Sequence, residues 1–515
     1  MTSRLVSCLL LPLALALGLA ASAHSAVRFG VTEDAGKYAD DGGATFFPTL
    51  TDLGMTQNRV TVFWDAAHPA EIQEKAFLDR FLPVAAADHV QIVFSVQPLH
   101  ATDVTSTPGG ALAFATYAAL LARTYPQVKE FVIGNEPNQP RFWRPQFSAG
   151  GRGVAAAAYE QVLALTYDAL KAVDPTIDVI GLGLSPRGND DPRARSNVST
   201  SPVRFIHDLG AAYRASGRPR PIMDELAFHP YPNPSSGNDP LLKGYQWPNA
   251  GVPNFARIKQ AVWDAFGGTA QPTFAESGGF LAASDTPPLT LFLDETGWQA
   301  AIPPGEQSAY TGRENSKTVS EAMQARIYGD LVRFVECDPS VTALDLFHLV
   351  DESDLDRFQS GLVRADGTHR PSYDAVKSAI ADSGGLCSDV EASWRHSTTV
   401  AGAVAAVGAA RGPGRFGFGV SVKEAAGFHA GIFRAAGRRL SESDRGAIGA
   451  ALASSGPAPG LVSRASGVVR AYWPSGVVFP ARSLAPGWYV YAVRFAASMN
   501  RSRTALLVGT PFRVG

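Results

Sequence analysis

The stretch Phe131-Val132-Ile133-Gly134-Asn135-Glu136-Pro137 is a short apolar run that ends in a turn. Consecutive apolar residues without alternation are typical of a strand that is covered on both faces, as in a parallel sheet. Gly134 and Pro137 interrupt the run and leave Glu136 at its carboxyl end. We therefore interpret this stretch as one buried strand followed by a loop that carries an acidic side chain.

Seven further runs of this kind lie along the chain, with amphipathic helical stretches among them. The eight expected strands span residues 27–31, 59–63, 90–95, 130–133, 177–182, 223–229, 289–294 and 341–349. The clearest helical patterns span residues 110–125, 154–173, 202–216, 255–266, 320–337 and 372–382.

Apolar strands that alternate with helices predict a parallel sheet covered by helices. Eight such repeats over about 360 residues predict a (β/α)8 barrel with long loops. A doubly wound open sheet is the alternative fold. It is disfavoured because no glycine-rich phosphate loop follows the first strand.

The character of the chain changes after Cys387. Residues 388–397 resemble a short linker, and residues 398–515 are rich in Ala, Gly and Arg with short strand-like runs. The clearest runs span residues 416–420, 467–472 and 488–493. This pattern predicts a small antiparallel β-sandwich as an accessory domain, after a barrel domain of residues 24–387.

The first residues have the pattern of a secretory signal peptide. A basic residue, Arg4, precedes an apolar stretch from Leu5 to Ala20, and Ala21-Ser22-Ala23 has the Ala-x-Ala form of a processing site. A membrane anchor is the alternative, but the run is short for a span and ends in small residues. We expect residues 1–23 to be removed and the mature protein to be soluble and secreted.

Charge and cysteine content narrow the possible partners. The net charge of −2 gives no electrostatic reason to expect nucleic acid or anionic lipid. No Cys/His cluster has metal-ligand spacing, so we expect no structural zinc. Beyond the signal, Cys337 ends the helix after strand seven and Cys387 follows the helix after strand eight, with two free buried thiols as the alternative to a disulfide. Both positions fall at the bottom of the expected barrel, and export supplies an oxidising setting, so we predict a disulfide between them.

A second carboxylate ends another apolar run, in Leu291-Phe292-Leu293-Asp294-Glu295-Thr296-Gly297-Trp298. Strands four and seven lie on opposite sides of a barrel, and a barrel's active site lies at the carboxyl ends of its strands. Glu136 and Glu295 can therefore face one another across the mouth. Such a pair can cleave a glycosidic bond, because one carboxyl group protonates the leaving oxygen and the other attacks the anomeric carbon. The alternative is two ordinary strand-end glutamates in salt bridges. Two carboxylates at two strand ends, both in glycine- or proline-marked turns, favour catalysis.

These paired motifs resemble clan A of the retaining glycoside hydrolases, with families 5 and 39 the nearest. Asn-Glu-Pro follows strand four and Glu-x-Gly-Trp follows strand seven. The segments Gly361-Leu362-Val363-Arg364-Ala365-Asp366-Gly367 and Arg370-Pro371-Ser372-Tyr373 resemble the part of the chain that closes many such barrels. The resemblance covers residues 27–382. It implies a retaining glycosidase that acts on a polysaccharide or glycoconjugate and needs no cofactor. An inactive carbohydrate-binding protein is the alternative, which the presence of both glutamates disfavours.

The resemblance also implies roles for individual residues. Glu136 corresponds to the acid/base and Glu295 to the nucleophile. The supporting residues would be Asn135 at the sugar 2-hydroxyl, Arg59 beside the nucleophile, and the His-x-Tyr pair His229 and Tyr231. We expect the two catalytic carboxyl groups to lie about 5 Å apart, as retention requires.

Aromatic residues near strand ends are candidate sugar-binding residues, because sugar faces stack on aromatic rings. Trp64 and Trp298 each follow a strand end, and Trp143 lies on the loop after strand four. Packing within loops is the alternative for all three. Many clan members carry a Trp at the end of strand eight, and here Phe347 or His348 takes its place.

Overall fold

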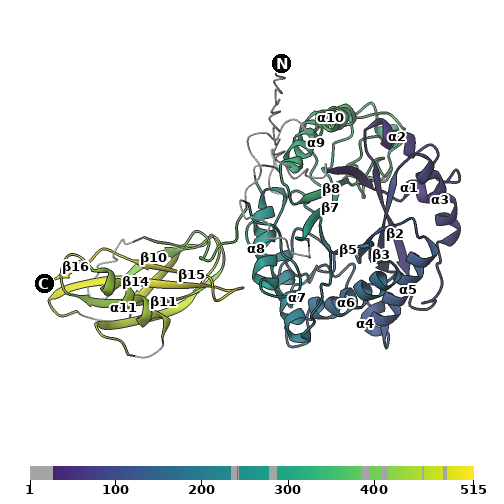
Figure 1. Ribbon diagram of the computed structural model, residues 1–515. Helices are drawn as coiled ribbons and strands as arrows, with labels where there is room; N and C mark the ends of the chain where they lie inside the picture. Colours follow the sequence, from purple (N-terminus) through teal and green to yellow (C-terminus); the bar gives the residue numbers. More distant parts are fainter. Residues whose placement is uncertain are drawn as a thin grey trace, which may run out of the picture.

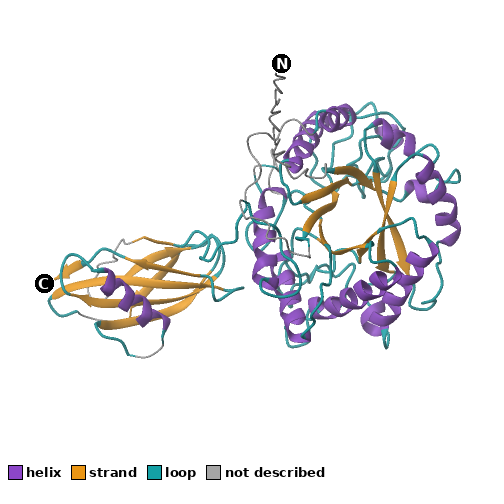
Figure 2. Ribbon diagram, viewed as in Figure 1, coloured by secondary structure: helices purple, strands orange, loops and turns teal. Residues whose placement is uncertain are grey.

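The computed structural model describes residues 27–233, 241, 243–277, 287–383, 394–406, 416–454, 457–479 and 484–515. The predicted signal peptide, residues 1–23, lies outside this range. Within it, eight parallel strands form a closed barrel in chain order, and a ring of helices surrounds the barrel (Figures 1 and 2). The predicted (β/α)8 barrel is therefore confirmed.

All eight predicted barrel strands are present, most with ends shifted by a few residues. They are β1 (Arg28–Thr32), β2 (Gln57–Trp64), β3 (Gln91–Pro98), β4 (Glu130–Ile133), β5 (Asp178–Leu184), β6 (Glu225–Phe228), β7 (Thr290–Thr296) and β8 (Val341–Leu346). Parallel pairing of β1 with β8 closes the barrel.

The six predicted helices are also present. They are α5 (Gly110–Thr124), α6 (Ala155–Val173), α7 (Pro202–Ser216), α8 (Phe255–Phe266), α9 (Glu321–Glu336) and α10 (Pro371–Ala381). The prediction omitted α3 (Lys75–Ala87), whose pattern is interrupted by Pro83. It also omitted the short elements α1 (Ala35–Tyr38), α2 (Phe47–Asp52), α4 (Asp103–Ser106), η1 (Val252–Asn254) and η2 (Gln307–Ala309).

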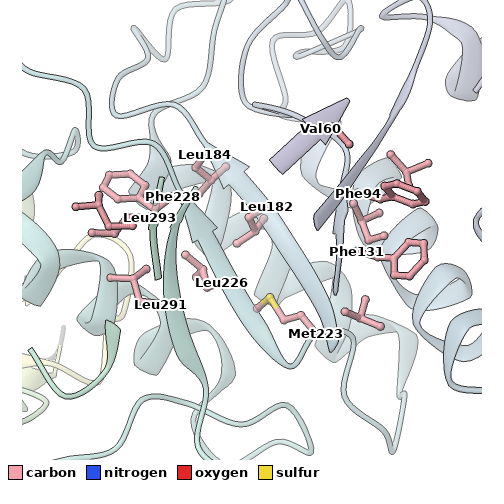
Figure 3. Close-up of a cluster of buried hydrophobic side chains, with 14 of the residues drawn as sticks. Val60, Phe94, Phe131, Leu182, Leu184, Met223, Leu226, Phe228, Leu291 and Leu293 are labelled. Atoms are coloured by element: carbon pink, nitrogen blue, oxygen red, sulfur yellow. The ribbon is translucent and has the colours of Figure 1, made fainter. Parts of the chain in front are cut away.

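Side chains alternate between the two faces of each strand, and this divides the barrel core in two. One layer inside the barrel is fully buried and apolar, and comprises Val93, Val132, Ile180, Ala227, Phe292 and Ala343. The opposite faces pack against the helices, and Figure 3 shows part of that layer, with Phe94, Phe131, Leu226 and Leu291 among its members. Because both faces of these strands are buried, their sequences are continuous apolar runs.

The C-terminal part consists of antiparallel sheets, in agreement with the predicted β-sandwich. One sheet has the order β13-β10-β9, and the other has the order β12-β11-β14-β15 with β16 on β14. A helix, α11 (Glu442–Ala453), lies between β11 and β12 and was not predicted. The strands are β9 (Val404–Ala406), β10 (Phe416–Ser421), β11 (Ala426–Ala435), β12 (Leu461–Val469), β13 (Ser475–Phe479), β14 (Gly487–Ala497), β15 (Thr504–Val508) and β16 (Phe512–Val514).

Residues 394–397, at the end of the predicted linker, lie against the barrel. Trp394 is 7% exposed and belongs to the barrel core, and the His396 ring stacks on Trp263 of α8 at 4.0 Å. The β-sandwich lies beside α8 (Figure 1). Its Arg503 forms ion pairs with Asp264 of α8 at 2.8 Å and with Glu424 at 2.7 Å. A buried cation between two buried carboxylates thus joins the two parts.

Cys337 is the residue that follows α9. Cys387 lies outside the described residues, so the disulfide between them stays a prediction. Among the helices that the structure describes, none is long and apolar enough to cross a membrane.

Buried carboxylates gather where β4, β5 and β6 begin. Glu130 pairs with Arg28 and accepts a hydrogen bond from Gln91 at 2.7 Å. Glu225 accepts one from the Thr342 hydroxyl at 3.1 Å. Burial, reinforced by the charge of Glu130 and opposed by Arg28, raises the pKa of Glu225 from 4.5 to about 7. This end of the barrel therefore holds a carboxyl group that stays protonated under mildly acidic conditions.

This pKa shift predicts a pH-dependent stability. Between pH 4.5 and about 7 the unfolded chain releases the Glu225 proton while the folded protein retains it, so the free energy of unfolding falls as pH rises through that window. A shift of this size corresponds to about 3 kcal/mol. In Glu225→Gln this contribution should disappear, and urea unfolding between pH 4.5 and 7.5 should show a flatter profile than the wild type. The exposed-site variant Glu71→Gln is the control, and an equal slope in Glu225→Gln and wild type would contradict the prediction.

Candidate active site

The loop after β4 turns sharply to carry Glu136 across the end of the barrel. Gly134 has φ of +81°, which favours glycine, and its N–H donates to the Val96 carbonyl of β3 at 2.7 Å. Glu136 has φ of +38° and its N–H donates to the Gly183 carbonyl of β5 at 2.9 Å. Backbone contacts to the strands on both sides therefore hold Glu136 in a conformation that non-glycine residues rarely adopt.

An irregularity in β7 places two successive carboxylates at the same site. The pairing register of β7 with β8 shifts between Leu293 and Thr296, and such bulges redirect side chains near active sites. Asp294 is fully buried, whereas the Glu295 side chain is 13% exposed. Regular alternation would send these two neighbours to opposite faces of the strand. Here both contact the same groups.

His229, which directly follows β6, lies between the two predicted catalytic glutamates. Its Nδ1 is 3.1 Å from Oε1 of Glu136 and 3.7 Å from Oε2 of Glu295. Two oxygens this close to one nitrogen lie within about 7 Å of each other, which is well below the longest separations of inverting pairs. The predicted spacing of about 5 Å lies inside this limit and stays a prediction.

Glu295 receives support from two sides. The Tyr231 hydroxyl donates to its Oε1 at 2.7 Å, and Nη1 of Arg59 lies 3.5 Å from its Oε2. Burial, with the charge of Glu295, raises the pKa of Tyr231 well above its ordinary value of 10.0. Tyr231 therefore remains a hydrogen-bond donor at any pH at which the protein works.

Arg59 connects four strands at the mouth of the barrel. Its Nη2 donates to the Ser95 hydroxyl at 2.9 Å and to Oδ1 of Asn135 at 2.8 Å. Its Nε pairs with Oδ2 of Asp294 at 3.0 Å. Asn135 is thereby oriented next to Glu136.

The structure brings six of the sequence-predicted residues together. The members of this group, referred to here as the glutamate site, are Arg59, Asn135, Glu136, His229, Tyr231 and Glu295. Within the part of the chain that the structure describes, no group of three or more His, Cys, Asp or Glu residues is placed to hold a metal ion.

The three tryptophans predicted to stack on sugars are buried. Trp64 is 0% exposed, Trp143 is 2% and Trp298 is 3%, so none offers a ring face to a ligand. Their rings pack edge-on against Phe114, Tyr159 and Tyr328 respectively. The alternation of side chains along β2 explains the burial of Trp64. Trp64 lies five positions after the inward-facing Arg59, so its side chain faces the helices.

A different set of aromatic rings lies beside Glu295. Phe358, on the loop after β8, is 43% exposed. Its ring centroid is 6.4 Å from that of Tyr231 and 4.9 Å from that of Phe347. His348 lies 6.3 Å from Phe358 and points Nδ1 at the Thr32 carbonyl (3.1 Å) and at Glu33 (3.4 Å). Phe347 and His348, the residues at the end of strand eight, thus lie in one cluster with Tyr231 and Phe358.

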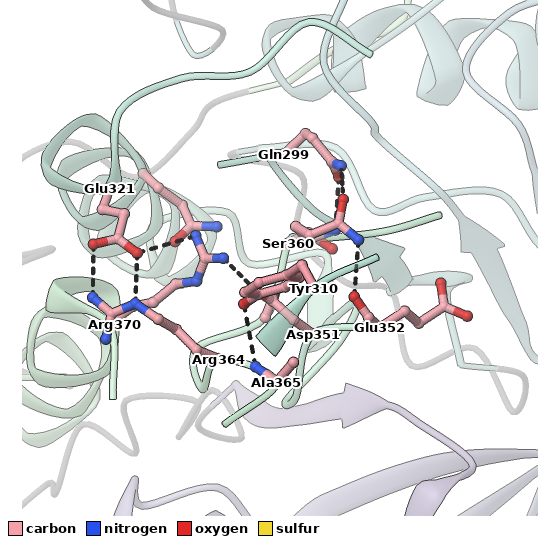
Figure 4. Close-up of polar contacts among 12 residues, drawn as sticks. Gln299, Tyr310, Glu321, Asp351, Glu352, Ser360, Arg364, Ala365 and Arg370 are labelled. Carbon is pink, nitrogen blue, oxygen red and sulfur yellow. Dashed lines mark hydrogen bonds and ion pairs between the residues drawn. The ribbon is translucent and has the colours of Figure 1, made fainter. Parts of the chain in front are cut away.

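The loop that carries Phe358 is braced by buried polar contacts (Figure 4). The Tyr310 hydroxyl donates to Asp351 at 2.6 Å, and Arg370 pairs with the same carboxylate. The Phe358 N–H donates to Oε2 of Glu352 at 3.0 Å. Acidic residues of this loop thus hold its conformation, and Phe358 is presented on a fixed support.

Sequence patterns missed two residues of this region. Asp294 lies inside the quoted motif next to Glu295, but regular alternation along the strand argues against a shared role. Phe358 lies in a loop far from any strand end, where no periodic signal marks it. Its exposure is visible only after folding.

Comparison with known proteins finds similarity in three dimensions only. No family model matches the chain, and neither does any curated protein. A family 39 glycoside hydrolase from Bacteroides cellulosilyticus WH2 is 16% identical, with a TM-score of 0.47 over 88% of this chain and 81% of its own. A family 39 β-xylosidase from Caulobacter crescentus is also 16% identical (TM-score 0.44; 89% and 96% covered). An endo-1,4-β-mannanase from Rhizomucor miehei is 13% identical (TM-score 0.42; 69% and 95% covered). At this level of similarity the reaction has to be inferred from the side chains of the site.

Proposed function

We propose that this protein is a retaining glycoside hydrolase with Glu295 as nucleophile and Glu136 as acid/base. The observation that supports this most directly is the contact of one imidazole nitrogen, Nδ1 of His229, with both carboxylates. Two carboxyl groups at this separation, each partly exposed, can reach the two sides of one glycosidic bond.

In the first step Oε of Glu295 forms a bond to the anomeric carbon while the bond to the leaving oxygen breaks. Glu136 transfers its proton to that oxygen, so the leaving group departs as a neutral alcohol. Tyr231 and Arg59 orient the Glu295 carboxylate for attack. In the second step Glu136 accepts a proton from water, the water oxygen bonds to the anomeric carbon, and Glu295 is released.

The remaining polar groups fit the recognition of a sugar. Asn135 is fixed by Arg59 beside the acid/base, in a position suited to a hydroxyl next to the anomeric carbon. We further propose that the protein is secreted, as the pattern of residues 1–23 indicates, and that its substrate is an extracellular polysaccharide or glycoconjugate. A carbohydrate-binding protein without activity is the alternative that the following experiment separates.

Hydrolysis of aryl glycosides should distinguish the roles of the two glutamates. Glu136→Ala should lose about 10² to 10⁴ in rate on substrates with poor leaving groups but retain activity on those with good ones, because such leaving groups need no proton. Glu295→Ala should lose nearly all activity on both, because the nucleophile cannot be bypassed. Glu71→Ala, at an exposed position, is the control. Equal losses in the two variants would contradict the roles, and a wild type inactive on every glycoside tested would favour the binding protein.

Phe358 should contribute to substrate binding by stacking on an apolar sugar face. An aromatic contact of this kind is worth about 0.5–1.5 kcal/mol, so Phe358→Ala should raise KM about 2-fold to 12-fold with little change in kcat. Phe358→Tyr should restore the wild-type KM. The matched control is Phe334→Ala, because Phe334 of α9 is 39% exposed and packs on Phe255 away from the glutamates. An unchanged KM in Phe358→Ala would refute the stacking role.

A further inference from the structure

Asp294 is a carboxylate beside the glutamate site that is closed off from any substrate by its burial. Its side chain is fully buried, and it lies directly before Glu295 on β7. A buried carboxylate is costly unless it is paired and hydrogen-bonded. The groups that Asp294 contacts therefore indicate its role.

Each oxygen of Asp294 faces a different cation. Oδ1 lies 3.2 Å from Nε2 of His229, and Oδ2 lies 3.0 Å from Nε of Arg59. The opposite sides of these two partners contact the glutamates, since Nδ1 of His229 is 3.1 Å from Glu136 and Nη1 of Arg59 is 3.5 Å from Glu295. Asp294 is therefore linked to Glu136 through His229 and to Glu295 through Arg59, and this pair of contact chains is called the relay below.

We propose that Asp294 is a positioning residue, which fixes His229 as an imidazolium between the two glutamates and fixes Arg59 beside Glu295. This inference rests on the proposed function. It extends that function, because Asp294 does not itself touch the reacting atoms.

Two N–H donors on the His229 ring match the carboxyl oxygens on its two sides. Both ring nitrogens lie within 3.2 Å of a carboxylate oxygen, and a neutral imidazole has only one N–H. Gly183 of β5 lies close to the His229 ring, since a Cβ added at Gly183 would be 3.3 Å from Nε2. The ring is thus held with one nitrogen on Asp294 and the other on the glutamates.

Charges on the surrounding elements agree with this assignment. Burial lowers the pKa of His229, but the charges of Asp294 and Glu295 outweigh it and raise the pKa to about 10. Burial by itself would raise the pKa of Asp294. The positive charges of His229 and Arg59 outweigh burial, so the pKa of Asp294 lies below its ordinary value. The other titratable groups that face the pair are Glu136 after β4, Tyr231 after β6, Tyr159 of α6 and Asp345 of β8.

Asp345 provides a matched control. It is also a fully buried aspartate, on the neighbouring strand β8, and it accepts a hydrogen bond from Gln57 at 2.8 Å. Its described contacts include neither His229 nor a glutamate of the site. Asp345 lies near Asp294 and Arg59, so Asp345→Asn tests the loss of a neighbouring buried carboxylate whose own hydrogen bond comes from Gln57.

The first measurement needs no substrate. Proton–nitrogen spectra of the full-length protein labelled with ¹⁵N-histidine follow the state of the His229 ring against pH, with the signal assigned by its loss in His229→Gln. We expect an imidazolium at pH 8 in the wild type and in Asp345→Asn, and a midpoint at least about one pH unit lower in Asp294→Asn. A wild-type His229 that is neutral at pH 8, or an unchanged midpoint in Asp294→Asn, would overturn the proposal.

The second measurement follows the rate. For an aryl glycoside, Asp294→Asn should lower kcat about 10-fold to 100-fold with a smaller change in KM, because small misplacements of catalytic groups have effects of this size. In Asp294→Asn, the decrease of kcat on the alkaline side of the pH profile should also begin at a lower pH. Asp345→Asn should keep the wild-type pH profile. A uniform loss across all pH values would reduce Asp294 to a structural role and refute the inference. Absence of activity in the wild type would instead refute the proposed function, and the histidine titration would still decide the relay.

Discussion

The pairing of one buried cation, the guanidinium of Arg59, constrains the whole mouth of the barrel. Its side chain is 2% exposed, and a charge removed from water in this way has to be compensated by close partners. The guanidinium is planar and offers its donors in fixed directions, so each partner has to lie at a defined place around it. Ser95, Asn135 and Asp294 occupy these places, from β3, the loop after β4, and β7. The turn at Gly134 brings Asn135 to the guanidinium, and Asp294 faces it by regular alternation from the inward-facing Phe292.

The barrel interior supports this arrangement by its layering. An apolar layer that includes Val132, Ile180 and Phe292 fills the middle of the barrel, as bulky side chains do in folds of this type. Polar groups gather on the two sides of that layer. Glu130 and Glu225 lie at the starts of their strands, and the glutamate site lies at the strand ends. The mouth is therefore the place where a ligand can meet charged groups that are already oriented.

The sequence predicts the barrel and the pair Glu136 and Glu295 because both depend on strong local signals, whereas Arg59, Asn135, His229 and Tyr231 were expected only from the resemblance to clan A. Continuous apolar runs mark strands that are buried on both faces, and the carboxyl ends of such strands converge. Glu136 and Glu295 could be paired on that basis alone. Trp64 is buried because strand parity, and not distance from the strand end, decides which face of β2 it occupies. The joint placement of Asp294 and Glu295 could not be predicted, since regular alternation sends such neighbours to opposite faces and the bulge appears only in the pairing of β7 with β8. Phe358 was missed because loop conformation is set by distant contacts such as that of Arg370 with Asp351.

The charges of the site are balanced throughout the proposed reaction. With Glu136 protonated at the start, the cations Arg59 and His229 face the anions Asp294 and Glu295. Formation of the glycosyl-enzyme consumes the charge of Glu295, and the same step creates one on Glu136, which has given up its proton. The negative charge therefore moves from one glutamate to the other, and hydrolysis moves it back. Because Nδ1 of His229 lies within 3.7 Å of an oxygen of each, one imidazolium can stabilise the anion in both halves of the cycle without moving. A buried site with this property avoids accumulating net charge in a medium of low polarity, where that would be most costly.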